Sequence, residues 1–371
     1  MEKRPYTELY LHIPFCAGKC HYCAFYSEGK WSRKDMEDFT RRILEQIQLN
    51  SHAFAPIRSI YLGGGTPTLL PPLLMEKILS SFARELPLSN ELEISCECNP
   101  ESLTKEMAVL LGKYVHRVTM GVQSFSNRKR ELIGRKGDAA SIEKAVTLLM
   151  DNGIKNIGLD LIYALPFQTL EEWKMDLEKA LTFPVSHLSC YALSLEEGTI
   201  LHQKNQLHPF PVNPDLEAEM WEFTGNFLRE RGFFRYEISN YALPGKESRH
   251  NCHIWEGAPY LGLGPGGCSF DGKVRFMEPP SLSNWLQGKE GEKDVVPPIT
   301  RLAELFIMGL RKCNGWEEDI WLKLTPHPWK SLFPSAIERG IALGLLREKE
   351  KALLPTEKGL AFWNDLAELF L

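Results

Sequence analysis

Three cysteines near the N-terminus have the spacing of a metal-binding loop. Cys16, Cys20 and Cys23 form a Cys-x3-Cys-x2-Cys motif that follows an apolar, strand-like run at residues 9–13. A proline and a glycine within this stretch favour a loop. Iron–sulfur clusters usually take four cysteine ligands. Three thiolates on a four-iron cluster would therefore leave one iron open to a second molecule.

Two other interpretations of this motif stay open from the cysteines alone. A structural zinc ion takes four protein ligands, and His12 or His21 could supply the fourth. The thiols could also be unrelated buried groups, because free cysteine often behaves as a small apolar residue. The rest of the chain has to decide among a cluster, a zinc ion and inert thiols.

Glycine and glutamate follow at the ends of the next two strand-like runs. Gly63-Gly64-Gly65 removes side chains where another group has to approach the backbone, although a tight turn would use glycine in the same way. Glu97 alternates with Cys96 and Cys98 along its strand. We expect the carboxylate to face the barrel interior and the two thiols to pack in the core. A solvated glutamate at a strand end is the alternative.

Three more polar residues, Gln123, Arg135 and Asp160, come near the ends of later strands. Asp160 lies among branched aliphatic residues, so we expect it to be buried. An unpaired buried carboxylate is costly, and it therefore needs a partner. That partner could be structural, such as Arg135, or it could be a ligand hydroxyl.

Six strand-like runs alternate with helical patterns over the first half of the chain. Regular alternation predicts a parallel sheet covered by helices. Six units are too few for a closed eight-stranded barrel, so we expect an α/β fold with a partial (β/α)6 barrel. Its functional end would be the C-terminal edge of the strands. The expected strands are 9–13, 58–63, 92–97, 115–122, 156–163 and 186–193, and the main helices are 33–49, 71–85, 103–113, 139–151, 170–182 and 214–231.

The pattern changes after the last of these helices. Residues 235–275 are rich in glycine and aromatic residues, and the next stretch carries prolines and charges. From residue 301, helical patterns and a short β-turn-β piece predict a winged-helix-like α+β module, with a lid or docking role as plausible as DNA binding. We expect a partial-barrel domain with a glycine- and aromatic-rich extension at 1–275, a connecting segment at 276–300 and a C-terminal winged-helix-like domain at 301–371.

Composition excludes several classes of partner and location. The net charge of −5 gives no excess of Lys and Arg for phosphates, so we expect no nucleic acid as the main ligand. No run of about 20 uncharged apolar residues predicts a membrane span. The charged N-terminus lacks the apolar run of a secretory signal. Nine widely spread cysteines suit reduced thiols, which predicts a cytoplasmic protein.

Together these motifs resemble the radical S-adenosylmethionine superfamily. Cys-x3-Cys-x2-Cys follows the first strand, and Gly-Gly-Gly-Thr-Pro-Thr follows the second. The phrases Tyr-x-His-Ile-Pro-Phe-Cys, Met-Gly-Val-Gln-Ser-Phe and Asp-Leu-Ile-Tyr-x-Leu-Pro resemble the oxygen-independent coproporphyrinogen oxidase group along nearly the whole chain. The resemblance implies a [4Fe-4S] cluster on Cys16, Cys20 and Cys23, with its open iron chelated by S-adenosylmethionine.

The same resemblance implies which residues surround S-adenosylmethionine. Glu97 would suit its amino group, Arg135 its carboxylate and Asp160 its ribose hydroxyls, and Tyr22 would lie against the adenine. One electron from the cluster could cleave the sulfonium to a deoxyadenosyl radical, which would require an electron donor. The implied cofactor residues are Tyr10, Tyr22, Gly64, Gly65, Thr66, Glu97, Gln123, Arg135, Asp160 and Ala192.

Two branches of this group differ in their N-terminal region. Coproporphyrinogen oxidases carry a further cysteine two positions after the third, where this chain has Phe25, and an extension ahead of the first strand. In both features this chain resembles the HemW-like heme chaperones instead. That resemblance implies bound heme as cargo, delivered to apo-proteins such as respiratory hemoproteins. The alternative is an oxidoreductase that oxidatively decarboxylates coproporphyrinogen III.

The chaperone branch carries a His-Asn-x-x-Tyr-Trp motif implicated in heme binding. This chain has His250-Asn-Cys-His-Ile-Trp255, with Ile254 in place of the tyrosine. The resemblance implies that His250 ligates the heme iron, that Trp255 offers an apolar plane and that Arg249 meets a propionate. A structural alternative is that the histidine caps a turn and the tryptophan fills the core.

Overall fold

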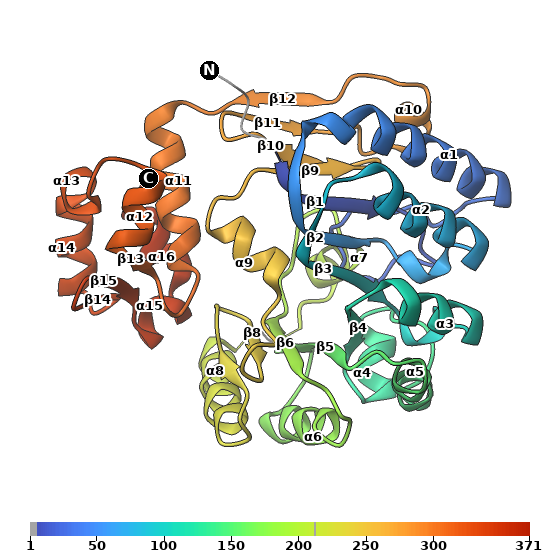
Figure 1. The fold of residues 1–371 in the computed structure, drawn as a ribbon. Coiled ribbons are helices and arrows are strands. Elements are labelled where there is room, and N and C mark those ends of the chain that lie inside the picture. The colour runs from blue at the N-terminus through green and yellow to red at the C-terminus, as the bar shows by residue number, and fades with distance from the viewer. Residues whose placement is uncertain (1–5, 211–212) are drawn as a thin grey trace.

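The computed structural model describes residues 6–210 and 213–371, and its centre is a twelve-stranded sheet with the order β12-β11-β10-β9-β1-β2-β3-β4-β5-β6-β8-β7. Strands β1 to β6 are parallel and adjacent in chain order. The predicted partial (β/α)6 barrel is therefore confirmed (Figure 1). Residues 1–5, on which the prediction of no secretory signal rests, lie outside the described residues.

The six barrel strands lie within a few residues of their expected positions. They are β1 (Tyr6–Ile13), β2 (Phe54–Gly64), β3 (Leu88–Cys98), β4 (Arg117–Gln123), β5 (Asn156–Tyr163) and β6 (His187–Ala192). The helices are α1 (Arg33–Asn50), α2 (Pro72–Glu85), α3 (Lys105–Tyr114), α4 (Asn127–Leu132), α5 (Ala140–Asp151), α6 (Leu170–Ala180), α7 (Ile200–Leu207) and α8 (Pro214–Arg229). Of these, α4 and α7 are too short to leave a clear helical period in the sequence.

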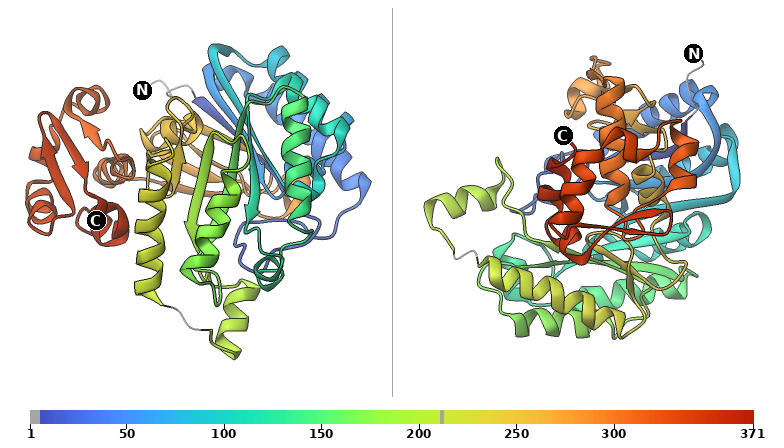
Figure 2. Two further views of the ribbon diagram at one scale, coloured as in Figure 1. Left: turned by 90° about the horizontal axis from the view of Figure 1, so that it is seen from below. Right: turned by 90° about the vertical axis from the view of Figure 1, so that its left-hand side faces the viewer.

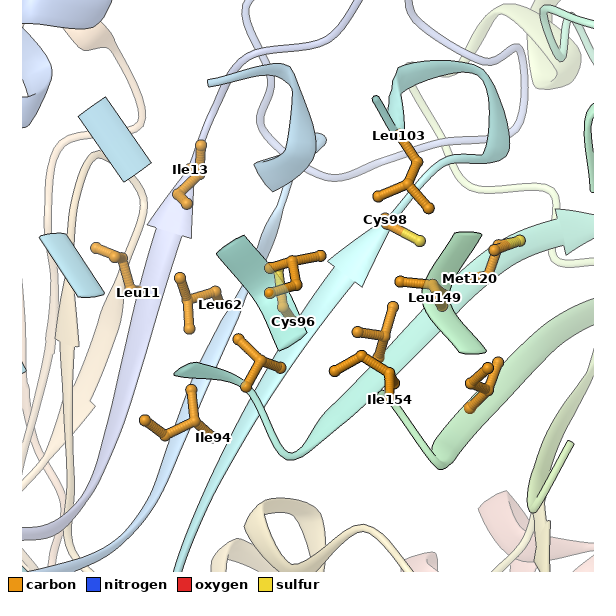
Figure 3. Close-up of a cluster of buried hydrophobic side chains, with 14 of the residues drawn as sticks. Leu11, Ile13, Leu62, Ile94, Cys96, Cys98, Leu103, Met120, Leu149 and Ile154 are labelled. Atoms are coloured by element: carbon orange, nitrogen blue, oxygen red, sulfur yellow. The ribbon is translucent and has the colours of Figure 1, made fainter. Parts of the chain in front are cut away.

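Alternating side chains give the barrel an apolar outer face and a polar inner face. On β3, Cys96 and Cys98 face outward and pack among Leu11, Leu62 and Met120 in the core under the helices (Figure 3). Glu97 faces the interior, where it meets side chains from β2. The expected division of this strand is confirmed. Each large apolar side chain buried on the outer face contributes about 1.5–3 kcal/mol.

The sheet extends beyond the six expected strands on both sides. The additional strands are β7 (Phe234–Arg235), β8 (Asn240–Ala242), β9 (Tyr260–Leu263), β10 (Cys268–Phe270), β11 (Val274–Met277) and β12 (Glu292–Val295). Residues 276–300, for which the sequence indicated only a connection, thus contain α10 (Leu282–Leu286) and the edge strand β12. The domain boundaries at 275 and 300 stay a proposal.

Residues beyond 298 form a second unit with a hydrophobic core of its own (Figure 2). Its small antiparallel sheet has the order β13-β15-β14. Its elements are α11 (Pro298–Leu310), β13 (Trp316–Glu317), α12 (Glu318–Leu324), α13 (Trp329–Leu332), α14 (Pro334–Ala342), β14 (Leu346–Lys349), β15 (Ala352–Pro355), α15 (Glu357–Ala361) and α16 (Trp363–Glu368). An ion pair of 2.7 Å between Arg275 and Glu304 connects it to the large sheet.

One more helix, α9 (Arg249–Trp255), lies against the concave side of the sheet (Figure 1). It contacts Glu8 in the first half of β1 and Ser59 at the centre of β2; we call this inner, N-terminal half of the barrel strands the barrel floor. The C-terminal ends of β1 to β6 form the barrel mouth, where the cysteine loop begins. In the described part of the chain, every helix is too short or too polar to cross a bilayer.

Candidate functional site

The cysteine loop leaves the barrel mouth between β1 and α1. Its two ends are pinned together, because the Glu28 N–H donates to the Pro14 carbonyl (2.8 Å) and the Cys16 N–H donates to the Glu28 carbonyl (3.0 Å). Cys16, Cys20 and Cys23 are free thiols, each partly exposed within this closed loop. The loop therefore presents all three sulfurs at the mouth.

The surroundings of these sulfurs fit an iron–sulfur cluster. Burial raises the pKa of Cys16 and of Cys23, and the neighbouring Cys20 raises both further, so the thiolates repel one another unless a cation joins them. Arg135 Nη1 lies 3.8 Å from Cys20 Sγ, and the Thr66 hydroxyl lies 3.7 Å from Cys16 Sγ. Such donors tune a cluster. Within the described residues, no three His, Cys, Asp or Glu side chains are already gathered tightly enough to hold a metal ion.

The two histidines considered as a fourth zinc ligand are engaged elsewhere. His12 Nε2 donates to the Tyr26 carbonyl (3.0 Å), and its Nδ1 accepts from the Tyr10 hydroxyl (3.2 Å). His21 Nδ1 lies 3.2 Å from both the Leu132 carbonyl and Lys204 Nζ. These contacts occupy both ring nitrogens of His12 and leave only Nε2 of His21 for a metal, so they remove one of the two candidate zinc ligands.

A pocket that is open to solvent lies beside the loop. Cys20, Thr66 and Arg135 line it together with Asn99. The Asn99 amide donates to the Thr66 hydroxyl (2.9 Å), and its oxygen accepts from Arg135 (2.7 Å). The sequence did not identify Asn99, although its position directly after β3 and before a proline is the signal that could have done so. Strand ends of β1, β2, β3 and the segment after α4 thus meet in one place.

Glu97 is the carboxylate at the centre of the expected S-adenosylmethionine site. It accepts hydrogen bonds from the Tyr61 hydroxyl (2.9 Å) and from the Gly64 N–H (3.3 Å). Burial, and then the charge of Asp160, raise its pKa to about 7, against the lowering effect of these two donors. Glu97 is half-buried, and a carboxylate with so few donors is suited to receive an ammonium group.

The glycine triplet is required by close contacts. A Cβ on Gly65 would lie 2.7 Å from the Pro14 carbonyl group, and Gly64 has a φ of +107° with the His12 ring 2.6 Å from where a Cβ would be. Only glycine fits both positions without strain. The close approach expected at this motif is therefore between its backbone and the start of the cysteine loop.

Arg135 and Gln123 converge over Gly121. A Cβ on this glycine would lie 3.0 Å from both Arg135 Nη2 and Gln123 Nε2. Gln123 has a φ of +70°, an uncommon backbone conformation for a non-glycine residue, next to an irregular register between β4 and β5. Such bulges re-aim side chains and are frequent at functional sites. Arg135 also donates to the Gly121 carbonyl, which anchors the guanidinium at the mouth.

Asp160 has a different partner from the one considered. Arg135 is not in ion-pair contact with it, and the carboxylate accepts from Ser189 on β6 instead. It is half-buried rather than fully buried. Burial raises its pKa to about 6, although Ser189 and two arginines act against this. Ser189 was missed because only the pairing of β5 with β6 brings it opposite Asp160. Ala192 ends β6 and is half-buried at the mouth.

The two expected tyrosines lie on opposite sides of the mouth. Tyr10 on β1 stacks on Tyr61, with ring centres 6.2 Å apart. Tyr22 packs against a small apolar cluster that includes Ile133, Ile162 and Leu165. Tyr22 thus lies at the β5 side of the cysteine loop, where an apolar wall could hold a planar ring.

The residues of the expected heme motif are buried on α9. His250 Nδ1 bonds to the Ser59 hydroxyl (2.7 Å), and the ring lies 5.3 Å from the ring of Tyr61. Burial lowers the pKa of His250 to about 4, so the imidazole is neutral at pH 7. Trp255 is buried beside Tyr236, with the guanidinium of Arg311 over its ring. Both side chains belong to the packed barrel floor in this structure.

The chain matches a family model and curated relatives. Residues 10–180 match the model described as the Radical SAM superfamily. The heme chaperone HemW of Lactococcus lactis is 32% identical over 369 residues, which cover 98% of this chain and 96% of the relative. HemW of Escherichia coli is 32% identical over 387 residues and the full length of both chains. A mouse mitochondrial protein, radical S-adenosyl methionine domain-containing protein 1, is 32% identical over 386 residues, covering 96% and 86% of the two chains.

A solved structure shares the fold along almost the whole chain. The coproporphyrinogen III oxidase HemN from Escherichia coli, described as a radical SAM enzyme, superposes with a TM-score of 0.85 at 20% sequence identity. The match covers 99% of this chain and 90% of that one. At this identity, the likeness establishes the barrel and its C-terminal unit as a shared fold.

Proposed function

Because the chain belongs to the HemW family of radical S-adenosylmethionine proteins, we propose that it binds a [4Fe-4S] cluster, S-adenosylmethionine and heme, and that it passes heme to apo-hemoproteins. The relatives named as heme chaperones cover its full length, which supports the last step. Respiratory hemoproteins are the expected acceptors. A cytoplasmic location is part of the proposal, because nine free thiols suit a reducing compartment.

Within this proposal, Cys16, Cys20 and Cys23 hold the cluster. Glu97, which faces the barrel interior, receives the amino group of S-adenosylmethionine, and Arg135, which lines the pocket beside Cys20, receives its carboxylate. When bound, the cluster can supply one electron to the sulfonium, and an electron donor is required if that cleavage occurs. The remaining residues at the mouth, Tyr10, Tyr22, Gly64, Gly65, Thr66, Gln123, Asp160 and Ala192, form the walls of this site.

The position of His250 carries the heme part of the proposal. The Ser59 bond at Nδ1 orients the ring, so Nε2 is the nitrogen left for a metal, and such an orienting bond is usual for metal-binding histidines. The ring contacts Tyr61, whose hydroxyl bonds to Glu97. The candidate heme ligand is therefore one side chain away from the candidate S-adenosylmethionine site.

Heme binding at this position requires a rearrangement of α9, because His250 and Trp255 are both buried. The helix is short, with seven residues, so moving it breaks few backbone hydrogen bonds. Ile254 replaces the usual tyrosine of the motif. We expect this change to weaken heme contact relative to family members that keep the tyrosine, or to shift it to the adjacent Cys252 or His253.

Heme titration of the anaerobically reconstituted protein tests the proposal. We expect stoichiometric binding by wild type, and loss of the histidine-ligand signature in the absorption and EPR spectra of His250→Ala. His327→Ala, in the C-terminal unit, serves as the matched control. Unchanged heme spectra in His250→Ala would remove His250 from the site. Wild type that binds no heme would contradict the chaperone function itself.

Turnover with coproporphyrinogen III separates the proposal from the oxidase alternative. Assayed anaerobically with S-adenosylmethionine and a reductant, the wild-type protein is expected to form no decarboxylated product. If product accumulates over many turnovers, the protein is an oxidoreductase rather than a heme chaperone. The fold shared with HemN makes this comparison necessary.

A further inference from the structure

The barrel floor contains a buried arginine without an acidic partner. In the described part of the chain, four Arg or Lys residues are buried as whole residues, namely Arg117, Lys129, Arg130 and Lys312. The last three each have a carboxylate within 3.0 Å. Arg117, only 1% exposed, makes no such ion pair; its Nη1 donates to the Lys246 carbonyl (2.8 Å), and its Nε and Nη2 have no partner among the described residues.

Two hydrogen-bond donors beside Arg117 also lack partners. His187 Nε2 lies 2.8 Å from the Tyr236 hydroxyl, whose oxygen accepts from the Ser248 N–H (3.2 Å). We assign the hydroxyl as the donor to Nε2, and this assignment leaves the hydrogen of the neutral His187 ring on Nδ1. Neither His187 Nδ1 nor the Ser248 hydroxyl has a partner among the described residues, and both residues are at least 97% buried. We call Arg117, His187 and Ser248 the donor cradle.

The donor cradle lies below the S-adenosylmethionine site on the same inner face. Thr119, Gly158 and His187 form one row across β4, β5 and β6. A Cβ on Gly158 would lie 3.3 Å from His187 Nδ1, so glycine keeps this nitrogen uncovered from the side of β5. The next row toward the mouth contains Asp160 and Ser189. Asp160 interacts with the charge of Arg117 from a distance, and no carboxylate of the described residues is in ion-pair contact with the guanidinium.

Solvent reaches the barrel interior two rows above the donor cradle. Tyr191 follows Ser189 on the same face of β6 and is 41% exposed although it points into the barrel. A ligand arm that enters at the mouth therefore has the row of Asp160 and Ser189 to pass before it reaches the donor cradle. Arg249, the arginine that the sequence suggested for a propionate, is engaged by Glu91 (3.5 Å), and its N–H donates to Glu93 (3.1 Å).

We propose that the donor cradle binds a carboxylate, and that this carboxylate is a propionate arm of the tetrapyrrole. The second part rests on the proposed function. A buried guanidinium needs a compensating anion, and a carboxylate bonds to it through two parallel N–H donors. The two neutral donors complete the coordination of the carboxylate oxygens. The donor cradle thus binds the propionate edge of the ligand, and His250 remains available to ligate the iron.

Heme and its dimethyl ester, in which both propionates are methylated, test this assignment on the full-length reconstituted protein. We expect wild type to bind heme at least tenfold more tightly than the ester, and Arg117→Met to bind both equally, with ester affinity unchanged. Methionine has a similar length, and replacing an unpaired buried charge by an apolar group is well tolerated. Arg117→Lys, which keeps the charge, should show intermediate discrimination. Arg249→Met is the matched control and should discriminate like wild type.

Equal binding of heme and ester by wild type would overturn the cradle and leave the chaperone function standing. Discrimination that survives in Arg117→Met would also overturn it, because the carboxylate would then be recognised elsewhere. Thermal unfolding with sodium propionate tests the cradle without heme. We expect a higher Tm for wild type and no change for Arg117→Met. If this shift appears in a protein that binds no heme, the carboxylate site stands and the proposed function fails; no shift and no heme binding would overturn both.

Discussion

The pKa of Glu97 predicts a pH dependence for S-adenosylmethionine binding. Burial and Asp160 raise this pKa to about 7, and the ammonium group of the ligand requires the ionised carboxylate. At pH 6, about one tenth of the free protein has Glu97 ionised, so affinity should be about tenfold weaker than above pH 8. Equilibrium dialysis of the cluster-loaded protein without reductant measures this directly, since no cleavage then consumes the ligand.

Glu97→Gln supplies the control for that titration. Glutamine keeps the shape and an acceptor oxygen for Tyr61 and Gly64. It loses a charged hydrogen bond worth about 1.5–3 kcal/mol, so affinity at pH 8 should fall about 10- to 100-fold. Between pH 6 and pH 8, the variant should show a flat profile. A flat profile in wild type would refute the assignment of Glu97, and a slope that persists in the variant would assign the titration to Asp160, whose pKa is about 6.

The raised pKa of Glu97 has the opposite effect on folding stability, which falls as pH rises. Glu97 binds its proton more tightly in the folded protein than in the unfolded chain, where its pKa is near the ordinary 4.5. Its stabilising contribution is therefore present below pH 4.5 and lost as pH rises through 7. Without S-adenosylmethionine, Glu97→Gln should remove this loss. Its unfolding free energy should exceed that of wild type by more at pH 8 than at pH 5.

Two further substitutions test the mouth. Cys20→Ser should lose the visible absorption of the cluster after reconstitution. The control Cys268→Ser, outside the motif, should retain full iron and sulfide. Full iron and sulfide in Cys20→Ser would contradict the assignment of the three cysteines as cluster ligands. Gly65→Ala should lower the unfolding free energy by about 1–3 kcal/mol and reduce cluster loading, because its Cβ would lie 2.7 Å from the Pro14 carbonyl group. Gly29→Ala, with nothing within 4 Å, should change neither in denaturant titration or iron analysis.

Local sequence patterns were sufficient for the barrel strands. Each of them alternates apolar outer and polar inner residues, as Cys96, Glu97 and Cys98 do, so strand and orientation could both be predicted. The extension of the sheet could not, because β7 to β12 are two to four residues long. Strands this short leave no alternation to detect. Of these strands, β9 pairs with β1 and β8 pairs with β6, and the others pair with these two or with one another. The sequence does not display this pairing.

The candidate site also has parts that local sequence patterns could predict and parts that they could not. The cysteine loop and glycine triplet are contiguous motifs, so their places at the strand ends could be predicted from the sequence, whereas their assignment to a cluster and S-adenosylmethionine depends on the family resemblance. The partner of Asp160 could not, because Ser189 comes opposite it only through the register of β5 and β6. Asn99 bridges Arg135 and Thr66 across three strand ends. Such contacts depend on the closure of the barrel, which local patterns do not specify.

A single strand connects the two ends of the barrel interior. Strand β2 ends in the glycines that approach the cysteine loop, and its middle carries Tyr61, which bonds to Glu97. Two residues earlier, Ser59 bonds to His250 and to the fully buried Glu8. The cofactor site and the candidate heme ligand are therefore attached to the same rigid element rather than to separate loops. A ligand that displaces His250 acts on side chains of β2, and any response at Glu97 has Tyr61 as its shortest route.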